Sequence, residues 1–330
     1  MQKKFIIITS IFPPTEAVEK FAAIEGWQLV VVGDKKSPTI WESKNVIYLG
    51  PEDQEKLGFN ILKHLPWNHY CRKMVGYLYA MSQGATMIAD SDDDNIPLAH
   101  WPNLPEAESE ILHLSGQPFV NIYKHFTKEF VWPRGYPLDR ILEKKTPTAT
   151  KKRHEVGIWQ FLANEDPDVD AIYRLTNNKQ IYFDDNEPIV LEEGTVCPFN
   201  SQDTIFQVNC FPLLYLPSFV TFRFTDILRG LVAQPLLWSQ NNTLGFGSAT
   251  VVQKRNPHDY MKDFTSEIPV YEHSETVISI VKSALDDPAL SLSQRLFKAY
   301  EALHEAGIVT KQELTLLQAW NSDIEALAKG

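Results

Sequence analysis

The pattern of hydrophobic and polar positions predicts four strands within the first 90 residues of the chain. Residues 4–12 (KFIIITSIF) and 27–34 (WQLVVVGD) are continuous apolar runs rich in β-branched side chains. Such runs are typical of strands that are covered on both faces. Shorter apolar runs predict two further strands, at 45–50 (NVIYLG) and 86–90 (TMIAD).

Segments with helical spacing separate these strands. The apolar positions of 14–24 and 70–85 recur at helical intervals. Pro14 and Thr15 suit the start of the first helix, and Gly84 suits the end of the second. The order strand, helix, strand, strand, helix, strand predicts an α/β sheet that is mostly parallel. In such a sheet, ligands bind at the carboxyl ends of the strands.

The middle of the chain has a mixed pattern. Residues 118–126 fit either a strand or a bend, and 131–138 (VWPRGYPL) predict a turn-rich loop. Residues 146–154 are polar and predict an exposed, mobile connection. The pattern of 155–176 predicts a helix, a loop and another element, and that of 219–238 predicts a strand leading into a helix.

The pattern becomes amphipathic from about residue 275 onward and predicts a C-terminal helical appendage. Ser291 suits a helix N-cap, and Gly307 suits a C-cap. We therefore expect two parts, an α/β domain over 1–275 and helices over 276–330. These helices pack either on the core or on another subunit, so a homo-oligomer is one expectation.

Composition narrows the class of protein. Hydrophobic residues make up 44% of the 330 residues, which argues against disorder. The formal net charge is −11 without a long basic run, so neither nucleic acid nor an anionic membrane is the expected partner. Apolar runs are too short for a spanning helix, and Ser10 and the following prolines interrupt the first run, unlike a signal peptide. We expect a cytoplasmic protein whose three cysteines are reduced.

The stretch ADSDDDN, residues 89–95, gathers four carboxylates within five positions. Like charges this close repel, so a cation commonly offsets them. A calcium-binding EF-hand loop is one interpretation, but Asn95 stands where glycine is needed and Trp101 where glutamate is needed. A phosphatase is a second, with Asp90 as the nucleophile at a strand end and Asp92 as the acid.

Two more interpretations of the acidic stretch remain. One is a solvated acidic loop that caps nearby backbone N–H groups. The other is a metal–diphosphate site, because a hard divalent ion takes carboxylate oxygens and bridges phosphate oxygens. Glycosyltransferases that use nucleotide sugars place an Asp-x-Asp at a strand end for this purpose. The run Asp92–Asp94 is a variant of that motif.

Surrounding motifs make the last interpretation more specific. They are GYLYAMSQGATMIADSDDDN, VWPRGYPLDRI, DPDVDAIYRLT, PFNSQDTIF, DILRGLVAQPLLW and VVQKRNPHDYMKDF. Together and in this order they resemble the STELLO-type glycosyltransferase family, from about residue 5 to 275, with the C-terminal helices outside the resemblance. The DDDN and PRGYPL pieces are also similar to the reversibly glycosylated polypeptides, the UDP-arabinopyranose mutases.

These resemblances imply a GT-A-like fold over 1–275, a nucleotide-sugar donor that is UDP-linked, and Mn²⁺ or Mg²⁺ as the cofactor. The expected activity is transfer of the sugar to an unidentified glycan or protein acceptor. A nucleotide-sugar mutase is one alternative, and a non-catalytic scaffold that binds nucleotide sugars is another.

The resemblance also implies roles for individual residues. The expected metal ligands are Asp92, Asp94 and His258. Alternate positions on an extended segment point to the same side, and GT-A enzymes often add a late histidine. Asp93 is expected to contact the sugar or ribose hydroxyls.

The nucleotide should be held by residues at strand ends and by cations. Thr9 lies at the end of the first predicted strand, and Asp34 ends the second. This fold commonly binds the uracil or ribose at these strand ends. The pyrophosphate needs positive charge, and the candidates are Arg72, Lys73, Lys254 and Arg255.

Two further residues are expected to take part in the chemistry. In the mutase relatives the arginine of the PRGYPL motif is glycosylated, which carries over to Arg134. Its simpler roles are stabilising diphosphate charge, which we favour, or an ion pair that braces the loop. Asp226 is the expected general base, with Asp168 and Asp170 as rivals. The neutral polar residues 200–202 suit sugar hydroxyls.

Overall fold

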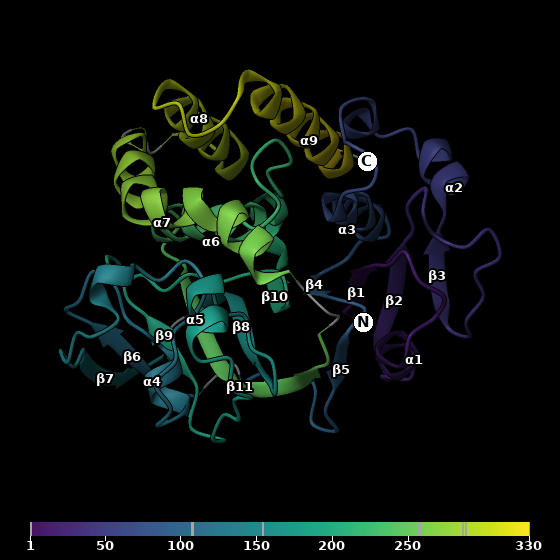
Figure 1. Cartoon of the computed structure of the whole chain (residues 1–330). Coiled ribbons are helices and arrows are strands. Elements are labelled where there is room, and N and C mark those ends of the chain that lie inside the picture. Colours follow the sequence, from purple (N-terminus) through teal and green to yellow (C-terminus); the bar gives the residue numbers. More distant parts are fainter. Residues whose placement is uncertain are drawn as a thin grey trace.

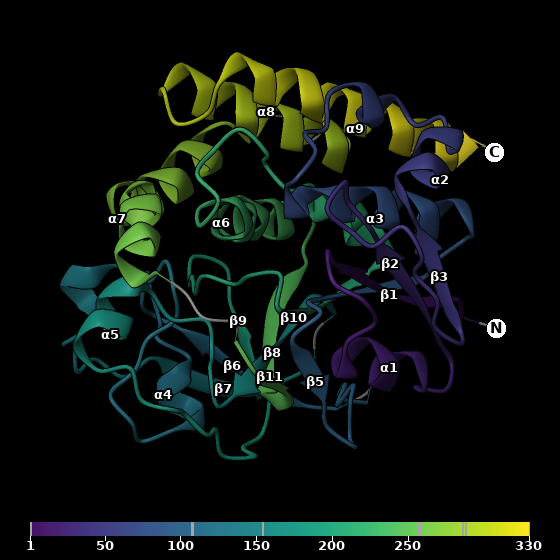
Figure 2. The same cartoon turned by 45° about the vertical axis from the view of Figure 1, so that its right-hand side comes forward.

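A mixed β-sheet with helices on both faces forms the body of the molecule, as Figures 1 and 2 show for this computed structural model. The model describes residues 2–106, 109–153, 155–255, 259–285, 287 and 289–329. The strands are β1 (Lys4–Thr9), β2 (Trp27–Val32), β3 (Val46–Leu49), β4 (Met87–Ser91), β5 (Asn95–Pro97), β6 (Ile111–Ser115), β7 (Thr148–Lys152), β8 (Val156–Asn164), β9 (Ile189–Leu191), β10 (Asp203–Gln207) and β11 (Thr243–Gln253). The α-helices are α1 (Glu16–Ala22), α2 (Pro51–Lys56), α3 (Lys73–Ser82), α4 (Tyr123–Phe126), α5 (Ala171–Thr176), α6 (Thr225–Trp238), α7 (Tyr260–Ser283), α8 (Leu292–Glu305) and α9 (Lys311–Lys329). Short 3₁₀ helices are η1 (Asn60–Lys63), η2 (Tyr70–Arg72), η3 (Leu138–Arg140) and η4 (Val208–Leu214).

The strand order is β3-β2-β1-β4-β10-β8-β11-β9-β6-β7, with β5 paired to β11. Strands β1 to β4 run parallel to one another. Strand β10 is antiparallel to both β4 and β8, and so joins the parallel N-terminal half to the rest of the sheet. The predicted mixed sheet with flanking helices and C-terminal helices is confirmed.

The continuous apolar strands follow from burial on both faces. Successive side chains of a strand point to opposite faces, so an all-apolar strand requires two covers. Ile7 of β1 packs in the core beneath α3 and α6, whereas Ile6 and Ile8 pack on the other face with Phe21 of α1. Thr15 caps α1 by accepting from the N–H of Val18, as its position before the helix predicted.

Two predicted elements in the middle of the chain are wrong. The first part of 155–176, predicted as a helix, is β8, which lies between β10 and β11 and is buried along nearly its whole length. A short, fully buried apolar run has no periodicity that separates strand from helix. Residues 148–152, within the expected mobile connection, form the exposed strand β7 against β6.

The other differences between the prediction and the structure concern residues 118–126, residues 219–224 and strand β11. Residues 118–126 contain the short helix α4 rather than a strand. No strand precedes α6 in the described segment 219–224, although α6 itself is confirmed. The long strand β11 was missed, because its glycines and small polar residues interrupt the apolar pattern.

The C-terminal helices lie on the outer side of α6 and α3, as Figures 1 and 2 both show. Ser291 forms the predicted N-cap of α8, within a reciprocal capping box with Gln294. Helix α7 runs through residue 275, so the predicted boundary falls inside a helix, and the division into two domains stays a prediction. Among the described residues, the helices are too short or too polar to span a bilayer.

Candidate functional site

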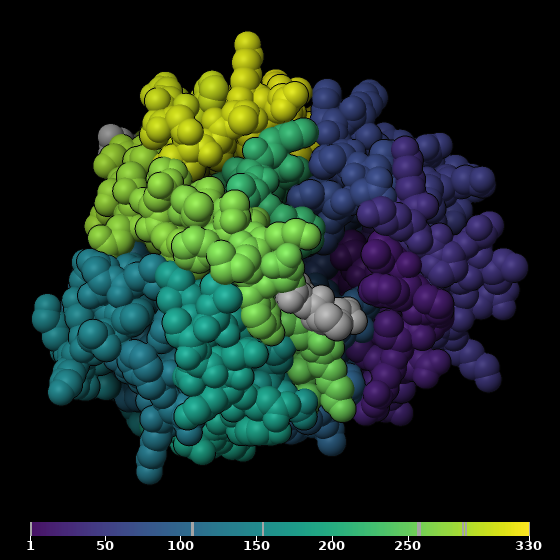
Figure 3. Space-filling model, viewed as in Figure 1, coloured from purple at the N-terminus to yellow at the C-terminus, as the bar shows by residue number. Residues whose placement is uncertain are grey.

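A pocket of about 350 Å³ opens where β1, β2 and β4 end. Figure 3 shows a hollow here, between the N-terminal segment in purple and the later segments in green. Because parallel strands end at the same edge of the sheet, Thr9, Asp34 and the acidic loop after β4 meet around this pocket, as predicted. The opposite wall comes from residues 200–202 and from the segment that leads into α6.

The acidic loop contributes three carboxylates to the pocket. Asp93 accepts a hydrogen bond from the hydroxyl of Ser10 at 2.5 Å, which turns it towards β1. Asp94 accepts from the amide of Gln253 at 3.3 Å. Burial raises the pKa of Asp92 to about 7, with Lys73 opposing the rise and Asp94 adding to it. Burial also raises the pKa of Asp94, and Asp93 adds to that rise. A cation in the pocket would relieve this repulsion.

The fourth carboxylate of the cluster has a different position. Asp90 is fully buried in β4 between Lys73 and Arg229, with both N–O distances 2.8 Å. Its side chain is therefore part of an internal ion network and does not line the pocket. This placement does not favour the phosphatase interpretation, because a nucleophile must reach its substrate.

Lys73 belongs to the same network, which differs from its expected role. Its ammonium donates to the carbonyl of Ser91 at 2.7 Å and contacts Asp90 and Asp92 at 2.8 Å each. These three partners use the three protons of the ammonium. Lys73 thus lies beneath the acidic loop and neutralises it from inside the protein, rather than facing a pyrophosphate.

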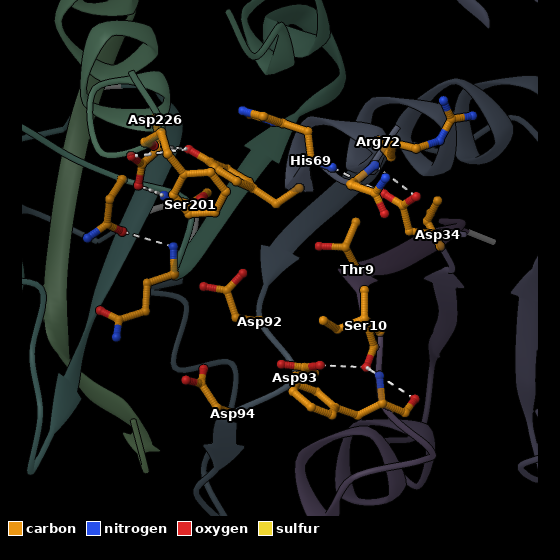
Figure 4. Close-up of a pocket in the computed structure, with 18 of the residues that line it drawn as sticks. Thr9, Ser10, Asp34, His69, Arg72, Asp92, Asp93, Asp94, Ser201 and Asp226 are labelled. Atoms are coloured by element: carbon orange, nitrogen blue, oxygen red, sulfur yellow. Dashed lines mark hydrogen bonds between the residues drawn. The ribbon is translucent and has the colours of Figure 1, made fainter. Parts of the chain in front are cut away.

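The structure describes two of the three expected metal ligands, Asp92 and Asp94. Figure 4 shows the Asp92 and Asp94 side chains extending from the loop in the same direction, although residues 93 and 94 form a turn rather than the extended segment on which the prediction rested. His258 lies outside the described residues. In the described part of the chain, no three or more His, Cys, Asp or Glu side chains gather as a metal-binding group. The site therefore offers two protein carboxylates, a donor set that suits Mg²⁺ or Mn²⁺ when phosphate oxygens and water complete the shell.

Asp34 lines the pocket, but its carboxylate is already engaged. It accepts from the backbone N–H groups of Asn68 at 2.9 Å and His69 at 3.2 Å, and so fixes the turn before α3. His69 and Tyr70, which sequence reasoning missed, consequently line the pocket. Their rings stack at 5.2 Å, and nothing in the local sequence distinguished them from core aromatics.

The three other cations expected to bind the pyrophosphate, Arg72, Lys254 and Arg255, have different surroundings in the structure. Arg72 lines the pocket, but its guanidinium donates to Gln54 at 2.7 Å and lies over the ring of Trp67 at 3.5 Å, and Figure 4 shows it directed away from the acidic loop. Lys254 is exposed, and its backbone N–H donates to the carbonyl of Asp94 at 3.1 Å. Arg255 does line the pocket, paired with Asp166 at 3.1 Å.

Arg134 and Asp226 are partners of each other. The guanidinium of Arg134 binds Asp226 through two nitrogens, at 3.0 and 2.8 Å, and Asp168 through Nε at 2.8 Å. Burial opposes ionisation of Asp168, but Arg134 and Arg223 outweigh it and lower its pKa. These contacts match the interpretation of Arg134 as an ion-paired brace. Asp226 lines the pocket, and both of its carboxylate oxygens accept from the guanidinium of Arg134.

Asp170 and residues 200–202 complete the predicted set. Asp170 caps α5 by accepting from the N–H of Tyr173, so it serves the fold rather than the pocket. Residues 200–202 all line the pocket, and their contact with sugar hydroxyls stays a prediction. Asn200 donates to Asp168 at 2.7 Å, which ties this wall to the Arg134 network.

The Arg134→Lys variant should lose about 2–4 kcal/mol of unfolding free energy, because one ammonium cannot serve two carboxylates in fork geometry. Urea denaturation measures the effect. Arg140→Lys is the matched control, since Arg140 pairs with Glu143 and Glu275 at a partly exposed site. Its change should stay below about 1 kcal/mol. Equal losses of unfolding free energy in the two variants would contradict a stabilising role for the contacts of Arg134 with Asp226 and Asp168.

The fold and the pocket together define the class. A mixed α/β sheet with an acidic loop at the end of β4, facing the ends of β1 and β2, is a GT-A-like arrangement. Comparison with known proteins narrows this class. Residues 223–329 match the family model of the STELLO glycosyltransferases.

Two relatives extend the match over nearly the whole chain. The chain is 30% identical to the probable glycosyltransferase STELLO1 of Arabidopsis thaliana, in an alignment covering 98% of this chain and 44% of that protein. It is 32% identical to the probable glycosyltransferase STELLO2 of the same plant, over 72% of this chain and 34% of that protein. The chain therefore spans less than half the length of these relatives. Its resemblance to the STELLO glycosyltransferases is confirmed.

One detail of the resemblance is corrected. The C-terminal helices were expected to lie outside it, yet the family match extends to residue 329 and so includes α7, α8 and α9. The amphipathic pattern of these helices is common to many proteins, so their sequences carry few family-specific motifs. Side chains of these helices are buried in the same core cluster as side chains of α6 and α3.

Proposed function

We propose that this chain transfers a sugar from a nucleoside-diphosphate sugar, with UDP as the nucleotide, to a glycan or protein acceptor. The observation that carries the proposal is the pocket in which Asp92 and Asp94 face the ends of β1 and β2. The similarity to probable glycosyltransferases supports the same class of reaction.

In this proposal Asp92 and Asp94 hold Mn²⁺ or Mg²⁺. The ion would neutralise charge on the departing diphosphate. Lys73 supports the site from below, because it offsets one unit of carboxylate charge and sets the direction of Asp92. Thr9 and the turn held by Asp34 would bind the nucleoside, and Arg255 would face the phosphates.

The opposite wall would hold the sugar and the acceptor. The hydroxyl and amide groups of residues 200–202 suit sugar hydroxyls. Asp226 faces the pocket and is the candidate base, with its bidentate partner Arg134 beside it. A mutase that forms a bond to Arg134 is disfavoured, because three carboxylate contacts already occupy that guanidinium.

Calorimetric titration of the protein with UDP, in the presence of Mn²⁺ and in its absence, tests the proposal. We expect binding with a Kd in the micromolar range that weakens by about tenfold or more when EDTA removes the metal. Incubation with UDP-sugars and product analysis then separate transfer from binding alone. Metal-dependent UDP binding without any product would favour a nucleotide-sugar-binding scaffold. The absence of UDP binding would contradict the proposal.

Cytoplasmic location and oligomeric state stay predictions.

A further inference from the structure

The segment 218–223 joins η4 to α6 without regular secondary structure and carries Phe222 to the pocket wall. Phe222 is 55% exposed, and its ring lies 4.7 Å from that of Tyr70 and 5.3 Å from that of His69. A segment outside helices and sheets depends on side-chain contacts for its position. What holds 218–223 therefore decides where this part of the wall lies.

One end of the segment is held by helix α9. Glu313 of α9 is fully buried, and its carboxylate accepts from the N–H of Ser218 at 3.0 and 3.1 Å and from the N–H of Phe219 at 2.8 Å. The hydroxyl of Tyr215 donates to the same carboxylate. A buried carboxylate needs such donors, and here the donors belong to the chain that enters the pocket wall.

The other end of the segment is held by helix α7. Glu267, also fully buried, pairs with the guanidinium of Arg223 at 2.8 Å. The hydroxyl of Thr221 donates to the carbonyl of Ser266 at 2.6 Å, and the N–H of Arg223 donates to the hydroxyl of Ser266 at 3.2 Å. Arg134, in turn, donates to the carbonyl of Arg223. The segment thus connects the C-terminal helices with the Arg134 network.

We propose that Glu313 is a positioning residue, which holds the start of segment 218–223 from helix α9 and so keeps Phe222 against Tyr70 in the pocket wall. The consequence for turnover rests on the proposed function. Phe222 packs on Tyr70, whose hydroxyl lies 3.5 Å from a carboxylate oxygen of Asp226, the candidate base on the sugar and acceptor side of the pocket. Loss of Glu313 should therefore impair turnover more than it impairs binding of UDP.

The chain offers a matched control on the same helix. Asp323 of α9 is buried and also accepts three hydrogen bonds, from the N–H and the side-chain amide of Asn60 at 2.8 and 3.0 Å and from the N–H of Ile61 at 2.9 Å. Its partners belong to η1, which does not line the described pocket. Glu313→Gln and Asp323→Asn therefore disturb similar caps, at a pocket segment and at a remote one.

Hydrogen exchange and kinetics on the full chain test the proposal. In Glu313→Gln, the amides of Ser218 and Phe219 should exchange about tenfold faster or more, while those of Asn60 and Ile61 stay unchanged. Asp323→Asn should show the reverse pattern. Turnover should fall by about tenfold or more in Glu313→Gln alone, with the Kd for UDP within about threefold of wild type.

Two outcomes would overturn the proposal. One is unchanged exchange at Ser218 and Phe219 in Glu313→Gln, and the other is an equal loss of turnover in both variants. If Glu313→Gln does not fold, Tyr215→Phe removes one donor to the same carboxylate and should show a smaller effect in the same direction. A wild-type protein that neither binds UDP nor turns over a UDP-sugar would contradict the proposed function instead, and the exchange data would still decide the positioning role.

Discussion

The Asp94→Asn variant is expected to lose metal-dependent binding of UDP, and its kcat/KM for a UDP-sugar should fall by about 10³-fold or more. The substituted amide would keep the shape of the side chain and remove one of the two carboxylates proposed to hold the metal ion. Within the described residues, the Asp94 carboxylate accepts hydrogen bonds from Gln253 alone, at 3.3 and 3.5 Å, so little else should change. Calorimetry with Mn²⁺ and UDP, followed by a donor-hydrolysis or transfer assay, measures both effects.

The stability of the Asp94→Asn variant should separate function from folding. Burial and Asp93 raise the pKa of Asp94, so its ionised form costs free energy in the folded protein. For a carboxyl with a raised pKa, the stabilising contribution is complete below the unfolded value and is lost as pH rises through the folded value. At pH 7 the neutral amide should therefore leave the metal-free protein as stable as wild type, or more stable. A lower melting temperature would mean that lost activity reflects lost fold.

The Asp90→Asn variant is expected to lose about 3–5 kcal/mol of unfolding free energy. Asp90 lies between Lys73 and Arg229, and these three side chains are at most 1% exposed. Removing the carboxylate charge leaves Lys73 with Asp92 as its remaining ion-pair partner and takes from Arg229 the carboxylate it pairs with, and burying an uncompensated charge is costly. Urea denaturation followed by tryptophan fluorescence measures the loss.

Asp53→Asn is the matched control for both aspartate variants. Asp53 pairs with Lys56 at 3.2 Å on the surface of α2, where its side chain is 52% exposed. Exposed pairs contribute little, so its change should be within about 0.5 kcal/mol and its activity that of wild type. An Asp90→Asn loss below about 1 kcal/mol would show that the buried network is not needed to hold β4 to α3 and α6.

The sequence predicted the N-terminal half of the sheet well, because there the constraint is local. Apolar, β-branched runs such as 4–12 have few stable outcomes other than a buried strand, and Thr15 and Gly84 mark the adjoining helix ends. The strand β8 escaped the same reasoning. Its residues are mostly apolar and buried on both faces, so their place between β10 and β11 is visible only in the tertiary structure.

The candidate site divides in the same way. That Asp92, Asp93 and Asp94 follow a buried strand and lie at the carboxyl edge of the parallel strands could be predicted from sequence, since an apolar run that ends in a polar cluster is a short-range pattern. The groups that the cationic side chains contact could not be predicted from the sequence. Lys73 lies beneath the acidic loop and Arg72 on Trp67, because the packing of α3 against the sheet determines which way each side chain points.

The sequence by itself thus determined the alternation of strands and helices, the edge at which a ligand can bind and the carboxylates that face it. Only the tertiary structure decided which charges neutralise one another inside the protein and which remain for a ligand. It also decided that Glu313, distant along the chain, supports the pocket wall. The physical reason is that hydrogen bonds and ion pairs depend on distances between groups that the chain order leaves open, whereas strand and helix periods depend on neighbouring residues.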